Sequence, residues 1–371
     1  MSVSTRLKLA RKALHLTLSE VQIKTGVGTS TLSDFESAKR EPRLAQLVQL
    51  AKVYDRPLTF FLSDQPVSHE VVLWREKPKS PAAEQIQLRL LNLAEQYHHL
   101  EAWCDEHQPI RLPSVTAPNA ASFRYPDAQQ LAHDIRQQLA LGERPGQTLL
   151  RVLEEVCQVK VFHLDFEPTG SAACTFSPQF GAAVLLNSRH VRWRRNFDLA
   201  HELFHLVTWN VFRTEQTGTA VEASAQEEKF ATCFARHLLM PREVLRLVVD
   251  ARRAKNKDHL SFEDLFEVAR QFDVSVEALL WHISLEYKIP ETEVRNSLKA
   301  FRNQMSFWDD RERDIPPERP MRYQALARKA LRLGKLSTGR YAEYVGISRR
   351  EAMRIAEQSD KQDAEVEVVD S

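Results

Sequence analysis

Hydrophobic residues recur three and four positions apart along most of the chain, a spacing that predicts a mainly α-helical protein. In the first part they form short amphipathic segments, separated by Thr17, by a turn at residues 25–28 and by Pro42. The segments expected as helices cover residues 5–14, 18–25, 29–37, 43–54 and 58–62. We therefore predict a compact five-helix domain over residues 1–65.

A linker and a connecting helix are expected over residues 66–107. Three prolines and mixed charge between residues 66 and 81 favour an irregular segment. From residue 82 to about residue 106 the apolar positions return to helical spacing, which predicts one long helix. This helix would lead into the next domain.

The region 108–290 mixes both kinds of pattern and predicts an α+β domain. Two short apolar runs, at residues 159–165 and 182–186, are typical of buried strands. Helical spacing recurs over residues 128–140, 147–157, 192–209, 222–239, 242–253, 261–271 and 275–287. The fold class expected for the whole chain is therefore mainly α with a small β-sheet.

The last part of the chain, residues 291–358, predicts a small helical module. Its final helical segments are separated by turns that contain Gly334 and Gly346. These segments cover residues 327–334, 336–344 and 348–358. The rhythm resembles a second helix-turn-helix, and the acidic stretch 359–371 is expected to be disordered.

The composition is that of an ordinary soluble protein, with 43% apolar and 27% charged residues and a net charge of +1. This balance excludes a globally basic nucleic-acid coat. Positive charge is local instead: ten basic against six acidic side chains in residues 1–65, and twelve against six in residues 311–358. The four cysteines show no CxxC spacing, and neither a signal peptide nor about 18 consecutive apolar residues is present. We expect a cytoplasmic protein that does not enter a membrane.

The sequence His201-Glu202-Leu203-Phe204-His205 is the strongest chemical signal in the chain. Residues four apart lie on one helix face, so His201 and His205 can bind one metal ion, with Glu202 beside its water. The apolar neighbours, without Pro or Gly, predict a buried helix, where unpartnered imidazoles would be costly. We interpret the motif as a single-zinc site; the competing interpretation is a satisfied pair of core histidines.

A catalytic zinc ion needs a third protein ligand, and Glu228 is the preferred candidate. It begins a helix face with Ala231, Thr232 and Ala235, whose small side chains allow close approach to the histidine helix. Glu227 is the competitor, on a less open face of the same helix. Either carboxylate can instead be an exposed helical charge.

Around these residues the chain resembles the ImmA/IrrE family of metallopeptidases. The matching positions are Arg194-Arg195-Asn196-Phe197, Ala200 to His205, Glu228, Ala231 and Phe234-Ala235-Arg236-His237-Leu238-Leu239-Met240-Pro241. The likeness covers roughly residues 125–290 and implies a zincin-like fold. It also implies that His201, His205 and Glu228 hold Zn²⁺ and that Glu202 is the general base.

Two positions depart from the family pattern. Thr232 stands where Asn or Asp is usual, so the hydrogen bond that orients a ligand histidine is expected to be weaker or to come from another residue. Phe204 stands where Gly is frequent, which would narrow the pocket. No residue is assigned as the oxyanion stabiliser.

Residues 16–42 resemble the xenobiotic-response-element class of helix-turn-helix domains, with a second helix over 19–24 and a recognition helix over 29–37. The resemblance implies that Thr29, Ser30, Thr31 and Ser33 face base edges. Phosphate contacts are expected from Arg6, Lys8, Arg11, Lys39, Arg40 and Arg43. Leu18 and Asp34 depart from the DNA-binding pattern, so a domain that docks a protein partner is the alternative.

The resemblance to the peptidase family implies a zinc-dependent regulatory endopeptidase. It would cleave a helix-turn-helix transcriptional repressor during stress, phage defence or mobile-element induction. DNA is a possible partner of the N-terminal and C-terminal modules, and the substrate main chain would pair with a strand such as residues 181–186. Two alternatives stay open: a DNA-binding regulator whose zincin-like domain senses a ligand without hydrolysis, and a toxin–antitoxin type interaction protein.

Overall fold

The computed structural model describes residues 2–14, 16–54, 56, 58–62, 71–78, 82–113, 115, 120–166, 170–213, 222–304 and 314–358. The tail expected to be disordered, residues 359–371, lies outside this set. The chain divides into two compact units: residues 1–70 with 78–96, and residues 71–77 with 97–371. Among the described helices, none combines the length and apolar character that crossing a bilayer requires.

The first unit contains the five helices expected at the N-terminus: α1 (Val3–Ala13), α2 (Leu18–Thr25), α3 (Thr29–Glu36), α4 (Leu44–Val53) and α5 (Leu58–Leu62). A capping box between Thr17 and Glu20 begins α2. Gly26 ends this helix at φ +72°, a left-handed conformation that glycine adopts without strain. The core is built by buried side chains from all five helices, including Leu7, Val21, Leu32, Leu50 and Phe61.

A four-stranded mixed sheet lies at the centre of the second unit. Its strands are β1 (Val72–Trp74), β2 (Lys160–Leu164), β3 (Ala172–Ser177) and β4 (Gly181–Asn187), in the order β1-β3-β4-β2. The β1–β3 and β3–β4 pairs are antiparallel, whereas β4 and β2 are parallel. In this register Cys174 is the partner of Leu73 on one side and of Val184 on the other.

The strands correct two expectations from the sequence. Strand β1 lies within residues 66–81, which were expected as a linker, and its pairing with β3 makes it part of the central sheet. Strand β4 is an interior strand with partners on both sides, so it cannot offer a free edge to a substrate. The expected strand over residues 159–165 is confirmed as β2.

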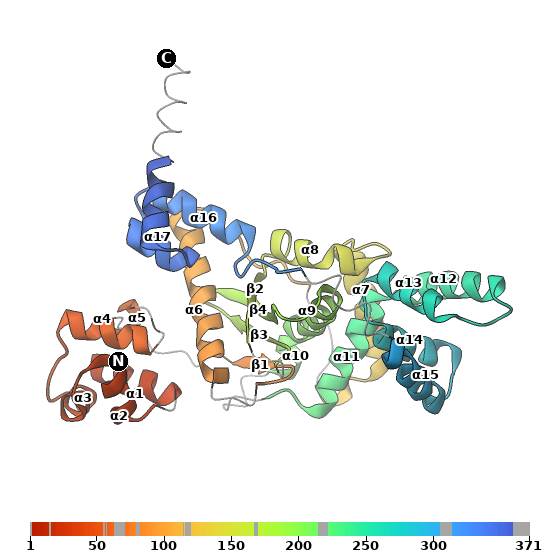
Figure 1. Cartoon of the computed structure of the whole chain (residues 1–371), viewed down its shortest axis with the longest axis horizontal. Helices are drawn as coiled ribbons and strands as arrows, with labels where there is room; N and C mark the ends of the chain where they lie inside the picture. Colours follow the sequence, from red (N-terminus) through yellow and green to blue (C-terminus); the bar gives the residue numbers. More distant parts are fainter. Residues whose placement is uncertain are drawn as a thin grey trace, which may run out of the picture. The chain divides into compact units, whose positions relative to one another are not determined.

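Helix α9 (Arg192–Val207) packs on β3 and β4, and α11 (Ala225–Leu239) packs on α9 (Figure 1). Helix α7 (Tyr125–Gln138) contacts α11, and α8 (Leu149–Glu155) contacts both α9 and β2. One apolar core runs through these layers and includes Val184, Leu203 and Phe234. Helix α9 therefore contacts the sheet as well as a second layer of helices, which buries most of its side chains.

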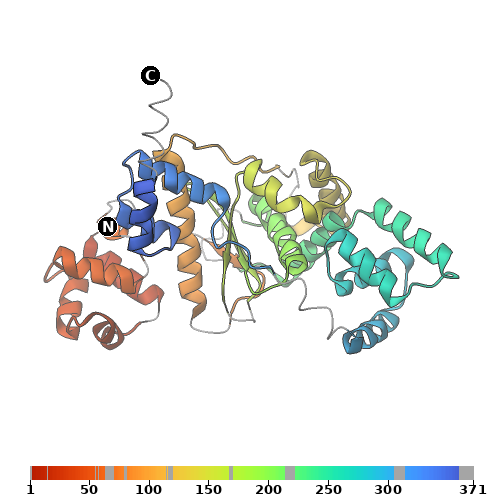
Figure 2. The same ribbon diagram turned by 45° about the horizontal axis from the view of Figure 1, so that its top comes forward.

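Four further helices follow α11 and pack in chain order: α12 (Arg242–Lys255), α13 (Phe262–Phe272), α14 (Val276–Tyr287) and α15 (Glu291–Gln304). Figure 2 shows them grouped at one end of the second unit. Helix α15 lies within the region 291–358 that was expected to be helical, but it was not predicted as a separate element, although Val294, Leu298 and Phe301 have helical spacing and are buried.

Helices α16 (Met321–Arg332) and α17 (Thr338–Val345), with a further helical stretch at 349–358, form the end of the described chain. They lie beside the C-terminal end of α6 (Ala82–Trp103) (Figure 2). There the ring centroids of Tyr97 and Tyr323 are 5.4 Å apart. The backbone N–H of His163 on β2 donates to the carbonyl of Glu318. The compact unit around the sheet thus extends beyond the expected bounds of 108–290 in both directions.

Candidate metal centre

Helix α9 carries the histidine motif into the interior. His201, Glu202 and His205 are at most 2% exposed, because α9 packs against the sheet and against α11. No Pro or Gly interrupts the helix, so residues four apart stay on one face. The sequence-predicted histidines therefore lie side by side in a buried layer, with ring centroids 5.1 Å apart.

Helix α11 brings the third candidate residue to the histidines. Ser224 caps the helix by accepting a hydrogen bond from the backbone N–H of Glu227 at 3.1 Å. Ala231 and Ala235 are fully buried, and their small side chains allow α11 to lie close to α9. The expectation of close approach along this face is met, and the approach places two consecutive carboxylates near the imidazoles.

Glu228, rather than Glu227, points to the space between the two histidines. Its Oε2 is 3.0 Å from Nε2 of His201, and its Oε1 is 3.2 Å from Nε2 of His205. The two Nε2 atoms are 3.3 Å apart. One ligand atom from each residue lies within 4.8 Å of the others, and the Glu228 side chain is 28% exposed, so the cluster is open on that side.

Glu227 holds the other side of His205. Its Oε1 accepts a hydrogen bond from Nδ1 of His205 at 2.9 Å, and Arg213 binds the same carboxylate through both terminal nitrogens, at 2.8 and 3.0 Å. A hydrogen bond that orients a ligand histidine was expected to come from a residue other than Thr232. For His205, Glu227 provides that bond. Nδ1 of His201 has no hydrogen-bond partner among the described residues.

Glu202 is completely buried, and neither of its carboxylate oxygens has a hydrogen-bond partner among the described residues. Burial raises the pKa of Glu202 to about 7, although the charge of His205 and the thiol of Cys174 act in the opposite direction. A carboxyl group with a pKa near neutrality can both accept and return a proton, which is what a general base needs.

The two histidines differ in their protonation. Burial lowers the pKa of His201 to about 4, so this ring is neutral near pH 7 and keeps a lone pair. Burial acts in the same direction on His205, but hydrogen bonds to Glu227 and Glu228 outweigh it and raise its pKa to about 9. Burial opposes the ionised form of Glu228, yet the same histidines lower its pKa to about 2. Near pH 7 the cluster therefore holds an ionised Glu228, a neutral His201 and a protonated His205, which must release one proton to bind a metal ion.

Helix α9 carries a second buried carboxylate, Asp198, that no sequence motif predicts. Asp198 is fully buried, pairs with Arg75 and lies with its Oδ2 3.4 Å from Nδ1 of His190. Arg75 follows strand β1, and its guanidinium lies 5.1 Å from the ring centroid of Phe197. The pair between Arg75 and Asp198 could not be predicted from a local motif, because the two residues are 123 positions apart in the sequence.

The residues expected to contact DNA divide into two groups. Ser30, Ser33, Arg40 and Arg43 are exposed, and Thr29 and Thr31 are half-buried, at or after the N-terminus of α3. Arg6 and Arg11 are corrections: Arg6 is 3% exposed and donates to the carbonyl of Phe60, and Arg11 forms a bidentate pair with Glu36. These two arginines support the fold of the domain and are not free for phosphate.

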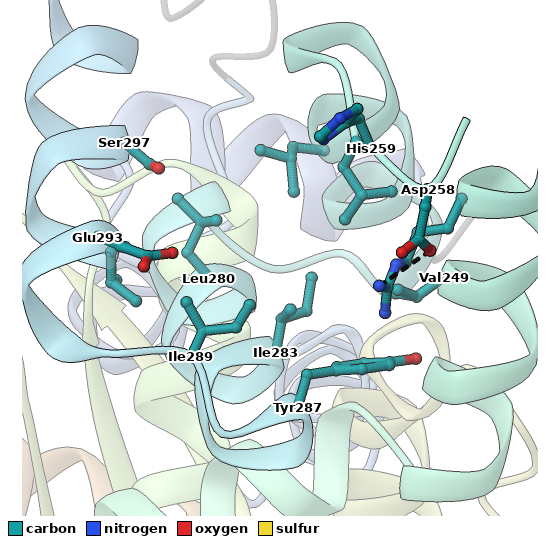
Figure 3. Close-up of a pocket in the computed structure, with 13 residues that line it drawn as sticks. Val249, Asp258, His259, Leu280, Ile283, Tyr287, Ile289, Glu293 and Ser297 are labelled. Atoms are coloured by element: carbon teal, nitrogen blue, oxygen red, sulfur yellow. Dashed lines mark ion pairs between the residues drawn. The ribbon is translucent and has the colours of Figure 1, made fainter. Parts of the chain in front are cut away.

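A separate cavity of about 450 Å³ lies among α12, α13, α14 and α15 (Figure 3). Leu280 and Ile283 form part of its apolar wall, and an ion pair between Arg253 and Asp258 lies at one side. None of the candidate metal ligands lines it. The histidine cluster, not this cavity, is the candidate centre for chemistry.

A family model described as the IrrE N-terminal-like domain, of peptidase family M78, matches residues 154–284. Residues 154–284 form an IrrE N-terminal-like domain. All four residues of the candidate centre lie inside the IrrE-like domain, which also contains β2, β3 and β4. A helix-turn-helix model matches residues 7–61, the region of α1 to α5. Both expected resemblances are thereby confirmed.

Other comparisons add little to the IrrE-like assignment. Among curated proteins, none matches the chain. The crystal structure of ComR from Streptococcus suis aligns with 98% of this chain and 96% of its own, at 12% identity and a TM-score of 0.16. A score this low supports no argument about fold or function.

Proposed function

We propose that this chain is a zinc-dependent regulatory endopeptidase. The observation that carries the proposal is the convergence of ligand atoms from His201, His205 and Glu228 beside the buried carboxylate of Glu202. These residues lie in an IrrE-like domain, whose family is one of peptidases. Family membership and geometry therefore support the same reaction class.

The donor set fits zinc. Two imidazole nitrogens and one carboxylate oxygen are a common set of protein ligands for catalytic zinc, with a further position left for water or substrate. Nδ1 of His205 donates to Glu227, so Nε2 is the atom that would release its proton and offer a lone pair when a metal binds. When bound, zinc supplies Lewis-acid chemistry that polarises a peptide carbonyl and makes water easier to deprotonate.

Glu202 is the proposed general base. Its carboxylate takes a proton from the attacking water and later returns that proton to the leaving amine of the cleaved peptide. Neither of its oxygens has a hydrogen bond of normal geometry among the described residues, although the thiol of Cys174 lies close enough to lower the pKa of Glu202. Arg75 has a positioning role in this account, because it neutralises Asp198 one turn before His201 on α9.

The proposed substrate is a helix-turn-helix transcriptional repressor, and the proposed setting is a cytoplasmic response to stress or mobile-element induction. The helix-turn-helix domain at residues 7–61 supports a regulatory role, because it can bring the peptidase to DNA or to a related partner. We place the substrate main chain along β1, which is an outer strand of the sheet, in place of the interior strand β4. Thr29, Ser30, Thr31, Ser33, Arg40 and Arg43 remain the proposed DNA contacts.

The test is cleavage of candidate repressors by the zinc-loaded full chain, with and without duplex DNA. Wild-type protein is compared with Glu202→Gln, which keeps the size of the side chain but cannot take a proton, and with Glu243→Gln, an exposed glutamate on α12, as the control. We expect wild type and Glu243→Gln to cut, and Glu202→Gln to lose cleavage by orders of magnitude. A biological response that is undiminished in Glu202→Gln would favour the regulator that senses a ligand without hydrolysis.

A further inference from the structure

A second cluster of metal-binding side chains lies outside the candidate centre. His237 is on α11, and His282 and Glu286 are on α14; one ligand atom from each lies within 4.8 Å of the others. His282 and Glu286 are four residues apart, so they share one helix face. The first cluster has the same arrangement: two ligand residues four apart on one helix, α9, and a third on a neighbouring helix, α11. Nine residues of helix, about 14 Å along the axis, separate Glu228 from His237, so the two clusters are distinct.

His282 is the second observation that points to a ligand. Its side chain is completely buried, and neither ring nitrogen has a hydrogen-bond partner among the described residues. The carbonyl of Met240 lies near enough to favour a proton on the ring, without a hydrogen bond of normal geometry. A buried polar side chain without partners carries a desolvation cost that only a ligand or water would offset.

His237 already has the hydrogen bond that a ligand histidine normally makes. Its Nδ1 donates to the carbonyl of Cys233 at 2.8 Å, which leaves Nε2 with a lone pair. The rings of His237 and His282 are 4.7 Å apart and nearly perpendicular, at 84°. One nitrogen of each ring is therefore available on neighbouring helices.

Glu286 supplies the negative charge. Its side chain is 7% exposed, and one oxygen accepts a hydrogen bond from Nε of Arg242 at 2.5 Å, which leaves the other oxygen available to the cluster. Arg242 is 58% exposed, so water screens much of its charge. Arg236 adds positive charge nearby, and the Glu286 carboxylate offsets it.

We propose that His237, His282 and Glu286 form a second zinc site, which ties α11 to α14. Two imidazole nitrogens and one carboxylate oxygen select zinc and similar transition metals over Mg²⁺ or Ca²⁺, which prefer oxygen ligands. A zinc ion at this site fixes the end of the helix that carries Glu228. Three protein ligands leave a fourth position for water. The site takes no part in peptide cleavage, because it lies about 14 Å along α11 from Glu228.

The test is zinc stoichiometry and affinity in the full chain, after a chelator has been removed and Zn²⁺ or Mg²⁺ added. We expect about two zinc ions per wild-type chain and about one in the His201→Ala/His205→Ala variant. In that variant, His237→Gln or Glu286→Gln should weaken the remaining site at least about tenfold. His133→Ala, which removes an exposed imidazole on α7, is the matched control and should leave both sites intact. Mg²⁺ should not compete.

The single variants Glu286→Gln and His237→Gln, made in the wild-type background, keep the test decisive if the double histidine variant does not fold. Each single variant should retain one zinc ion, and adding His201→Ala to it should remove that ion. Zinc should also raise the Tm of each single variant by less than it raises the Tm of the wild type, because the contribution of the second site is lost. Unchanged stoichiometry and affinity in both single variants would overturn the proposal. A wild-type chain that binds one zinc ion, sensitive to His237→Gln and not to His205→Ala, would instead support the second site and contradict the proposed catalytic one.

Discussion

Glu227 accepts a hydrogen bond from Nδ1 of His205 at 2.9 Å, on the opposite side of the ring from Glu228. The bond fixes which nitrogen of His205 carries the proton and directs Nε2 toward His201 and Glu228. Burial opposes the ionised form of Glu227, but the hydrogen bonds from His205 and Arg213 outweigh it and lower its pKa, and Arg213 also holds the carboxylate in place. In the proposed zinc site, the two adjacent glutamates on α11 therefore have different tasks: Glu228 is a ligand and Glu227 orients His205.

This division of tasks predicts different effects on zinc affinity. Glu228→Ala removes a ligand and should empty the catalytic site. Glu227→Ala leaves the ligand set complete but releases His205, so it should weaken zinc binding about 10- to 100-fold. Gln226→Ala, on an exposed position of the same helix, should have no effect. Competition with a chromophoric chelator measures all three. If Glu227→Ala loses zinc and Glu228→Ala retains it fully, Glu227 is the ligand and Glu228 is not.

The buried base should destabilise the metal-free protein at neutral and alkaline pH. The pKa of Glu202 is raised from 4.5 to about 7 in the folded chain, so folding favours its protonated form. The ionised form therefore costs stability above pH 7, by up to about 3 kcal/mol at 1.36 kcal/mol per pKa unit, and the cost disappears as the pH falls toward 4.5.

In the presence of a chelator, Glu202→Gln should accordingly be more stable than wild type at pH 8, with a difference that shrinks toward pH 5. Urea unfolding followed by circular dichroism at both pH values measures this. A difference of the same size at pH 5 and pH 8 would mean that ionisation of Glu202 is not its source.

The pair between Arg75 and Asp198 predicts a large loss of stability from a change at Arg75, a residue far in sequence from the histidine motif. Arg75→Ala leaves a fully buried carboxylate without its arginine partner, which should cost about 3–5 kcal/mol of unfolding free energy. Adding Asp198→Asn removes that charge and should recover part of the loss. Thermal unfolding of the two single variants and the double variant gives the coupling. Strict additivity of the two single effects would argue against the pair as a source of stability.

Helices with a clear hydrophobic period could be predicted from the sequence. The positions of residues that depend on contacts with distant parts of the chain could not. Helix α2 carries its own start and stop signals in Thr17, Glu20 and Gly26, so its bounds follow from local chemistry. A different signal, the spacing of side chains along a helix, predicted the histidine helix and the face of α11 that carries Glu228. Helical spacing fixes both without knowledge of the rest of the fold.

Strands β1 and β3 gave no comparable signal. β1 has three residues in a proline-bearing stretch, and pairing with β3 stabilises it. β3 is buried on both faces, so it lacks the alternation that marks a strand with one solvated face. Arg6 and Arg11 were expected to contact phosphate because they are basic. Their burial could not be predicted from the charge count, because it depends on partners from other helices.

The DNA contacts proposed for the helix-turn-helix domain predict two separable effects. Arg40→Ala and Arg43→Ala remove exposed positive charges and should weaken binding to all sequences, with a smaller dependence on salt. Thr31→Ala should instead change the preference at one base position. Fluorescence anisotropy titrations at two salt concentrations separate these outcomes. If DNA binding is absent and the domain retains affinity for a repressor, protein docking is its role.

The most direct test of zinc-dependent proteolysis is a map of protein N-termini in cells that produce either the wild-type chain or Glu202→Gln at equal levels. Zinc analysis of the two purified proteins first verifies that both hold the metal. The account predicts new N-termini within a transcriptional repressor in the wild-type cells, and none of these in Glu202→Gln cells. Identical sets of N-termini in the two cell types, with the inducing condition applied and both proteins zinc-loaded, would contradict it.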